Sequence, residues 1–136
     1  MDGEKESSTA LHLDLETIDL VKVLADFDEG VIIADREGSI IFYNRTMGKI
    51  DDLNPDEVIG KKVTDVYELN RENSIIYRCL LSGRPIVNEP LIYRTRFGKT
   101  AYTLDSALPL CQRGELAGAI CFVKDYTFED NIGEAP

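Results

Sequence analysis

A tight β-hairpin is predicted between Gly30 and Asn44, and this hairpin constrains the fold more than any other segment. It reads GVIIADREGSIIFYN, in which two β-branched apolar runs flank a charged turn that closes on Gly38. Apolar runs joined by a short turn with glycine are typical of paired antiparallel strands. Three short helices and three more strands are predicted after it. The element order ββαααβββ indicates an α+β fold.

The three helices between the strands are marked by residues that cap helix ends. Asn44 is expected to cap a helix that begins at Arg45. Asn54, followed directly by a proline, is expected to open the second helix, and Asn70 to cap a third over residues 71–82. The side chains expected to face inward are Met47, Ile50, Ile75, Ile76, Cys79 and Leu80.

A longer helix is expected over residues 11–27, after a disordered tail at residues 1–10. Its apolar side chains form two adjacent stripes, whereas a helix that packs on one surface needs a single stripe. The second stripe indicates a partner, most simply the same helix of a second copy. The alternative is that the extra leucines only widen the contact with the core. The residues expected at the interface of a homodimer are Leu11, Leu15, Ile18 and Val21.

The last two strands can be aligned through the turn between them. A three-residue loop over residues 112–114 places Cys111 opposite Glu115, and counting back places Asp105 opposite Cys121. In this register the two cysteines are about 20 Å apart along the hairpin, too far for a disulfide bond.

The same register sorts the side chains of these strands into two unlike faces. The bulky face suits the N-terminal helix, and the small face suits the three middle helices. Asp105 lies at the centre of the small face, where an unpaired buried carboxylate costs several kcal/mol. It therefore implies an internal cation or a ligand that supplies one. The bulky face carries Tyr102, Leu104, Leu108, Ile120 and Phe122, and the small face carries Thr103, Asp105, Ala107, Ala119, Cys121 and Val123.

The composition limits the partners of the chain. It has 25 acidic and 15 basic residues and a net charge of -10, which argues against nucleic-acid contact. No window holds the roughly 18 apolar residues that span a bilayer, and the polar start does not resemble a signal peptide. The three cysteines form no CxxC pair, so neither a disulfide framework nor a metal site is expected. We expect one cytoplasmic domain without membrane contact.

Three segments together resemble the PAS domain family: the hairpin, the turn NPDEVIG, and the ending LAGAICFVKDYT. In that ending, Asp125-Tyr126-Thr127 stands for the Asp-Ile-Thr of the family. The likeness covers about residues 20–127. It is greatest to the N-terminal PAS sensors of sigma-N-dependent (NtrC-type) transcriptional activators, including arginine-utilisation regulators.

The resemblance implies a PAS domain over residues 28–127. Its five-stranded antiparallel sheet would carry helices on one face, with a pocket between, and the N-terminal helix on the other. The resemblance also implies a homodimer and a bacterial transcriptional regulator whose output domain follows a linker that starts at residues 128–136. Ligand binding is expected to shift the N-terminal helix and the segment after Thr127.

The cofactor classes of the family can be compared with this sequence. Flavin-binding members carry a reactive cysteine in Asn-Cys-Arg-Phe-Leu-Gln, where this chain has Lys62-Val63-Thr64-Asp65-Val66-Tyr67, so no flavin–cysteine adduct is expected. Haem members commonly use an axial histidine, and the single histidine here is His12, so haem is not expected. Cys79 remains a conceivable attachment site for a coumaroyl chromophore, although its apolar neighbours favour buried packing.

The pocket positions of the family imply a small diffusible ligand. Asp105 would be its charge partner, and Tyr93, Thr103 and Tyr77 would supply hydrogen bonds, which suits a compact amine or amino acid. A charge-assisted bond of this kind contributes about 1.5–3 kcal/mol. The competing interpretation is that Asp105 is reached by Arg78, Arg94 or Arg96, or points to solvent. The expected ligand-binding residues are Ile32, Ala34, Tyr77, Tyr93, Thr103, Asp105, Cys121 and Val123, with Leu91, Thr95, Ala107 and Ala119 as further inward positions.

Other functions remain open alternatives. A PAS domain can serve only as a dimerisation module, since small side chains also let helices pack closer. The domain can also belong to a histidine kinase or a cyclic-dinucleotide enzyme. Asp105 beside Tyr93 resembles an acid–base pair, but no nucleophile–base pair, phosphate loop or metal cluster accompanies it. No enzymatic activity is therefore expected.

Overall fold

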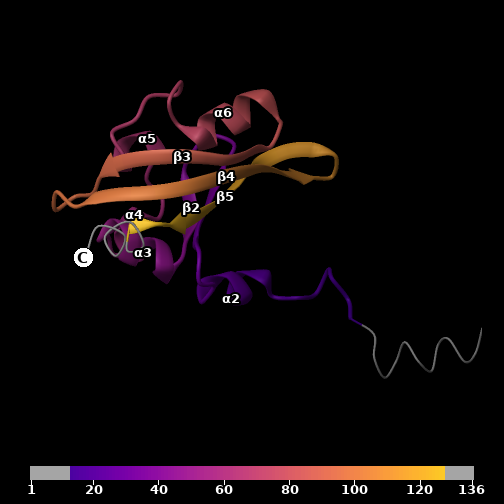
Figure 1. The fold of residues 1–136 in the computed structure, drawn as a ribbon. Coiled ribbons are helices and arrows are strands. Elements are labelled where there is room, and N and C mark those ends of the chain that lie inside the picture. Colours follow the sequence, from indigo (N-terminus) through magenta and orange to yellow (C-terminus); the bar gives the residue numbers. More distant parts are fainter. Residues whose placement is uncertain (1–12, 128–136) are drawn as a thin grey trace, which may run out of the picture.

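A five-stranded antiparallel sheet dominates the computed structural model, which describes residues 13–127. The strand order is β2-β1-β5-β4-β3, so the first and last strands of the fold pair at its centre (Figure 1). The α+β fold and the antiparallel sheet confirm the prediction. The strands are β1 (Gly30–Asp35), β2 (Ile40–Tyr43), β3 (Ile86–Arg94), β4 (Thr100–Gln112) and β5 (Glu115–Asp125).

Four short helices lie between β2 and β3, namely α3 (Arg45–Asp51), α4 (Pro55–Val58), α5 (Val63–Val66) and α6 (Ile75–Ser82). Two of them begin as predicted, since Asn44 caps α3 and Asn54 caps α4 with side-chain hydrogen bonds of 2.9 and 3.0 Å. Helix α5 was not predicted, because four residues are too few for a periodic pattern.

Helix α6 begins later than predicted. Its N-cap is Ser74, whose hydroxyl accepts the amide of Tyr77. Asn70 instead closes a local turn by accepting the amides of Glu72 and Asn73. An asparagine can stabilise either a helix cap or such a turn, so the sequence alone did not distinguish them.

The N-terminal helix is much shorter than the predicted helix over residues 11–27. Helix α2 (Leu20–Ala25) has six residues, none of them buried, and residues 13–19 form turns and irregular structure. In Figure 1, α2 lies below the strands and α6 lies above them. Near it, the ring of Phe27 packs edge-on against Phe122, with 6.3 Å between centroids. The described residues therefore leave most of the bulky face half-exposed, contrary to the expected helical cover.

The β4–β5 hairpin has a different turn from the predicted one. Its loop has two residues, Arg113 and Gly114, with φ of 53° and 81°, as in a type I′ turn. A bulge beside Leu110 follows. Asp105 consequently pairs with Val123, two residues beyond its predicted partner. Because side chains alternate with a period of two, this shift leaves the two predicted faces unchanged.

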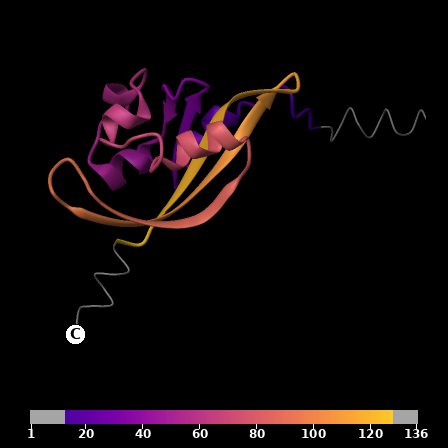
Figure 2. The same ribbon diagram turned by 90° about the horizontal axis from the view of Figure 1, so that it is seen from above.

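The small face of the sheet is buried beneath the helices, as predicted. Each of its six residues is less than a tenth exposed, including the polar Thr103 and Asp105. Figure 2 shows the long strands β3 and β4 curving around the helices. This curvature places the candidate site between the inner face of the sheet and the helical layer. No helix in the described part of the chain is both long and apolar enough to cross a membrane.

Candidate functional site

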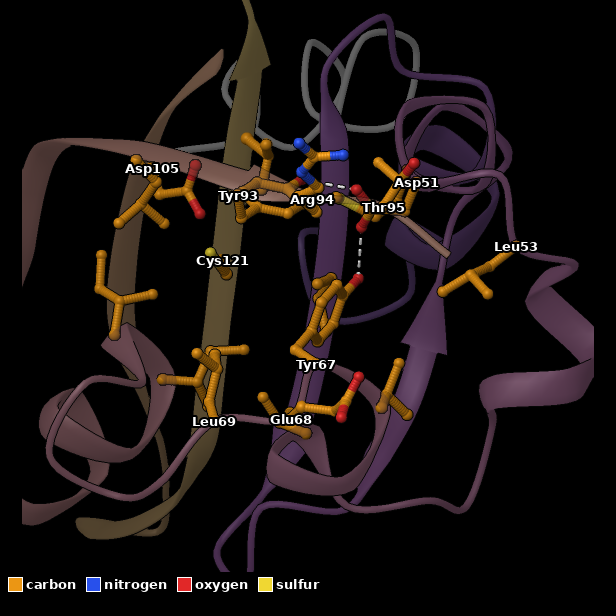
Figure 3. Close-up of a pocket in the computed structure, with 18 of the residues that line it drawn as sticks. Asp51, Leu53, Tyr67, Glu68, Leu69, Tyr93, Arg94, Thr95, Asp105 and Cys121 are labelled. Carbon is orange, nitrogen blue, oxygen red and sulfur yellow. Dashed lines mark hydrogen bonds between the residues drawn. The ribbon is translucent and has the colours of Figure 1, made fainter. Parts of the chain in front are cut away.

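A cavity of about 640 Å³ lies between the small face of the sheet and the helices (Figure 3). Its volume falls in the range of small-molecule pockets, which are typically about 300–1,000 Å³. Apolar side chains form most of the wall, and a few polar groups converge on the space. Those that matter for its chemistry are Asp51, Tyr67, Tyr93, Thr95 and Asp105.

The carboxylate of Asp105 enters this cavity without a cationic partner. Its side chain is 7% exposed, and its Oδ1 atom accepts no hydrogen bond from the described residues. Within residues 13–127, no lysine or arginine forms an ion pair with it. Arg78 and Arg96 pair with glutamates instead, and Arg94 donates to a backbone carbonyl. The competing interpretation that an arginine neutralises Asp105 is therefore wrong.

The environment of Asp105 disfavours its charged form. Burial raises the pKa of Asp105 from 3.8 to about 7, with a further contribution from the negative charges of Asp51 and Glu89, and the neighbouring Thr103 hydroxyl acts in the opposite direction. A cation placed beside this carboxylate would favour the charged form and lower the pKa again. The electrostatics beside Asp105 therefore favour a positive group over a neutral or negative one.

Asp51, the last residue of α3, contributes a second carboxylate to the cavity. The Tyr93 hydroxyl donates to its Oδ1 at 2.5 Å, and the Tyr67 hydroxyl donates to its Oδ2 at 2.6 Å (Figure 3). The Tyr43 hydroxyl lies 2.9 Å from that of Tyr67 and 3.3 Å from Oδ2. Burial raises the pKa of Asp51, while these hydroxyl donors act in the opposite direction.

The three tyrosines stay protonated and remain donors. Burial and the charge of Asp51 raise the pKa of Tyr43, Tyr67 and Tyr93 well above the ordinary value of 10.0. Tyr43 comes from β2, Tyr67 follows α5, and Tyr93 comes from β3. One carboxylate thus links β2, the segment after α5 and β3, and the latter two contribute Tyr67 and Tyr93 to the cavity wall.

Most of the residues predicted to bind a ligand line this cavity. Leu91 and Thr95 line it as well, whereas Ala107 and Ala119 are fully buried outside its lining. Ala34, Thr103 and Tyr77 are also outside the lining. The Tyr77 hydroxyl instead donates to the Glu37 carbonyl at 2.9 Å and braces the β1–β2 turn. The predicted residues that do line the cavity are Ile32, Tyr93, Asp105, Cys121 and Val123.

The sequence interpretation missed Asp51, Tyr43 and Tyr67. A signal for Asp51 was present, because it stands four residues after the inward-facing Met47 and therefore on the same side of α3. No comparable signal existed for Tyr67, which follows the short helix α5.

The cysteines and acidic residues form no metal site in the part of the chain that the structure describes. Cys79 and Cys121 are buried free thiols, and Cys111 is an exposed one. Cys79 packs in the apolar core, as its neighbours in the sequence indicated.

The residues predicted at a dimer interface lie on the surface of this single chain where they are described. Leu15 and Val21 are 74% and 53% exposed, and Ile18 is half-buried. Leu11 lies outside the described residues.

Comparison with known proteins agrees with the observed fold. A model of the PAS domain family matches residues 28–128. The transcriptional activator RocR of Bacillus subtilis (strain 168) is 30% identical over 117 residues, which cover 84% of this chain and 25% of RocR. The chain therefore spans about a quarter of the length of this curated relative.

Two solved structures illustrate the likeness in fold. The PAS domain of a protein from Colwellia psychrerythraea superimposes with a TM-score of 0.68 at 14% identity, over 85% of this chain and 99% of that one. The PAS domain of a LuxR-family transcriptional regulator from Burkholderia thailandensis, in complex with ethanol, gives a TM-score of 0.61 at 16% identity, over 79% and 97%. At these identities the structures show a shared fold.

Proposed function

This chain belongs to the PAS domain family, and we propose that it is the sensor domain of a bacterial transcriptional regulator that binds a compact cationic metabolite, an amine or an amino acid. The observation that carries this proposal is the carboxylate of Asp105, which is 7% exposed and has an unpartnered oxygen inside a cavity of about 640 Å³.

Leaving the Asp105 carboxylate unpaired is costly in free energy. A buried charge without a partner destabilises the fold by several kcal/mol. A ligand ammonium group beside Asp105 offsets this cost and forms a charge-assisted hydrogen bond. A neutral ligand of the same size can donate a hydrogen bond but supplies no compensating charge, so the cavity favours a cation.

The regulatory role rests on the relatives. RocR is a transcriptional activator, and the Burkholderia thailandensis PAS domain comes from a transcriptional regulator and holds ethanol in its structure. A metabolite sensor that controls transcription acts in the cytoplasm. We expect binding without turnover, because no nucleophile–base pair accompanies Asp105 in the described cavity wall.

Helix α3 offers a route by which binding can reach the N-terminal segment. Asp51 at its end lines the cavity, and Asn44 precedes its start. The Asn44 side chain donates to the carbonyls of Leu24 and Glu29, at 2.9 and 3.0 Å, and so attaches the end of α2 to α3. A ligand that moves Asp51 would shift this attachment, provided that it has different affinities for the two arrangements.

A homodimer through the N-terminal segment is part of the proposal. Leu13, Leu15, Leu20, Val21 and Val23 are each more than half exposed within residues 13–25. A short segment with this many exposed apolar side chains is typical of an interface. Light scattering of the unaltered protein and of the double variant Leu15→Glu, Val21→Glu tests this part, and a monomeric unaltered protein would contradict it.

The test of ligand binding is calorimetric titration of the protein with a panel of primary amines and amino acids, arginine and ornithine included, at about pH 8. We expect saturable one-to-one binding of at least one cation, recovery of the compound unchanged, and a loss of about tenfold or more in affinity for Asp105→Asn. Asp28→Asn is the matched control, since Asp28 is exposed, lies outside the cavity lining and forms no hydrogen bond or ion pair with the other described residues. If no cation binds, the chain is a dimerisation module and the proposal fails.

A further inference from the structure

We propose that the ligand carries two positively charged groups, one held by Asp105 and the other by Asp51. This inference rests on the proposed function and narrows its ligand class from any small cation to a diamine.

Two buried carboxyl groups line the cavity. Asp51 and Asp105 are 2% and 7% exposed, and both line the same space. They are close enough for the charge of Asp51 to raise the pKa of Asp105. Figure 3 shows the two carboxylates on opposite sides of Tyr93 in that view. Two negative groups thus face one cavity from separate parts of its wall.

The positive side chains near the cavity are paired with other groups. In residues 13–127, neither carboxylate forms an ion pair. The positive charge of Lys99 lowers the pKa of Asp51. The Lys99 ammonium group itself pairs with Asp52, at 3.8 Å. Arg94 and Arg96 line the cavity, but their side chains are exposed and bind a backbone carbonyl and a glutamate.

The tyrosine hydroxyls fill only part of the hydrogen-bonding capacity of Asp51. Each hydroxyl has one proton to donate, and a carboxylate offers about four acceptor positions. Tyr67 and Tyr93 make the two short bonds, while Tyr43 lies closer to the Tyr67 oxygen than to Asp51. The hydroxyl groups stabilise Asp51 by hydrogen bonds but add no positive charge. Asp51 therefore has acceptor positions left for a further donor, and no positive group of the described residues is paired with it.

The tyrosine rings also suit a cationic group. The rings of Tyr67 and Tyr93 are perpendicular, with centroids 6.4 Å apart. Aromatic faces attract alkylammonium groups, most strongly where water is excluded. A corner of two rings beside a carboxylate is a favourable place for one end of a diamine.

An independent observation comes from Thr95. Its side chain is 8% exposed, it lines the cavity, and its hydroxyl oxygen has no hydrogen-bond partner among the described residues. A buried hydroxyl of this kind is normally satisfied. A primary ammonium group has three N–H donors and can serve a carboxylate and a hydroxyl at once.

Two carboxyl groups in one cavity favour a ligand with two amino groups. A single positive charge compensates one carboxylate and leaves the other buried beside it, whereas two charges on a short chain compensate both. An amino acid with a free carboxylate would add a third negative group to the cavity. The protein is therefore expected to bind a diamine more tightly than the monoamine of the same chain length.

Calorimetric titration at about pH 8 and about 0.15 M salt tests this inference with putrescine against butylamine and cadaverine against pentylamine. We expect one diamine per chain, bound about tenfold or more tightly than its matched monoamine. Asp51→Asn should remove that advantage and leave monoamine affinity within about twofold. Asp28→Asn should change neither the diamine advantage nor the monoamine affinity. That result would exclude nonspecific attraction of a dication to an acidic protein.

The outcomes separate the two proposals. If monoamines bind at Asp105 and diamines bind no more tightly, the proposal of a second charged contact at Asp51 is wrong. The proposal of a cationic ligand is then still supported. If neither class binds, both proposals fail. If Asp51→Asn fails to fold, the affinities of diamine and monoamine for the unaltered protein still show whether a second positive group strengthens binding.

Discussion

The Tyr93 hydroxyl donates a 2.5 Å hydrogen bond to the Asp51 carboxylate, across 42 residues of sequence. This bond joins β3 to the end of α3 on the wall of the cavity. Hydrogen bonds to a charged, buried acceptor contribute more than neutral ones. The contact therefore serves both the stability of the wall and the shape of the site.

Replacement of Tyr93 by phenylalanine should destabilise the fold by about 1.5–3 kcal/mol, because Asp51 loses a donor and remains buried. Urea denaturation followed by circular dichroism measures this change. Tyr102→Phe is the matched control, since Tyr102 is half-buried on the bulky face and its hydroxyl makes no hydrogen bond to the described residues. Equal losses in the two variants would contradict the role of Asp51.

Asp105 should make the protein less stable as the pH rises. Its pKa is about 7 in the fold and near 3.8 in the unfolded chain, so between these values the native state holds a proton that the unfolded state releases. The free energy of unfolding therefore falls from about pH 4 to about pH 7, and the whole penalty is present above pH 7.

Asp105→Asn should remove this dependence. Without ligand, the variant should exceed the unaltered protein by roughly 2–4 kcal/mol at about pH 8, and the difference should shrink towards zero at about pH 4. Denaturation across this pH range provides the measurement. A variant that is less stable at about pH 8 would show that the carboxylate has a partner in the fold.

Gly38 should tolerate alanine much less well than Gly83 does. Both have positive φ, 85° and 68°, which costs a residue with a side chain about 1–2 kcal/mol. A Cβ atom at Gly38 would also collide with the Tyr77 ring, whereas nothing lies within 4 Å of one at Gly83. Thermal denaturation of the two alanine variants should give the larger loss for Gly38→Ala, and similar losses would mean that Tyr77 moves freely aside.

Asn44→Ala should be more costly than Asn54→Ala, although both residues cap helices. Asn44 is 2% exposed and uses its full hydrogen-bonding capacity on four backbone groups. Asn54 is exposed and caps with a single bond. We expect losses of about 3 kcal/mol or more and of about 1 kcal/mol, respectively. Loss of the N-terminal attachment should also speed amide exchange in Leu24 and Ala25, and unchanged exchange would count against that attachment.

Much of the fold was predictable from the sequence because its signals are local. The hairpin at Gly38, the cap at Asn44 and the two-residue alternation of β4 and β5 each depend on near neighbours, and the structure has all of them. The register of β4 and β5 was wrong by two residues, since a two-residue turn and a bulge cannot be distinguished from a three-residue loop by composition.

The candidate site was predictable only in part. Asp105 was found because a charged residue interrupts a face of small side chains. Asp51 and its tyrosines come from elements far apart in the chain, and their meeting depends on how α3 and β3 pack. The length of the helix over residues 11–27 was overestimated. Apolar periodicity indicates an amphipathic segment, but it gives neither the length of the helix nor the surface that covers it.

The most direct test of an anionic anchor in a receptor cavity is the titration of the Asp105 carboxyl carbon by nuclear magnetic resonance, with and without putrescine. We expect a pKa of about 7 in the free protein and a fall of about one unit or more when the amine is bound. A pKa near 3.8 in the free protein, or one that bound amine leaves unchanged, would contradict it.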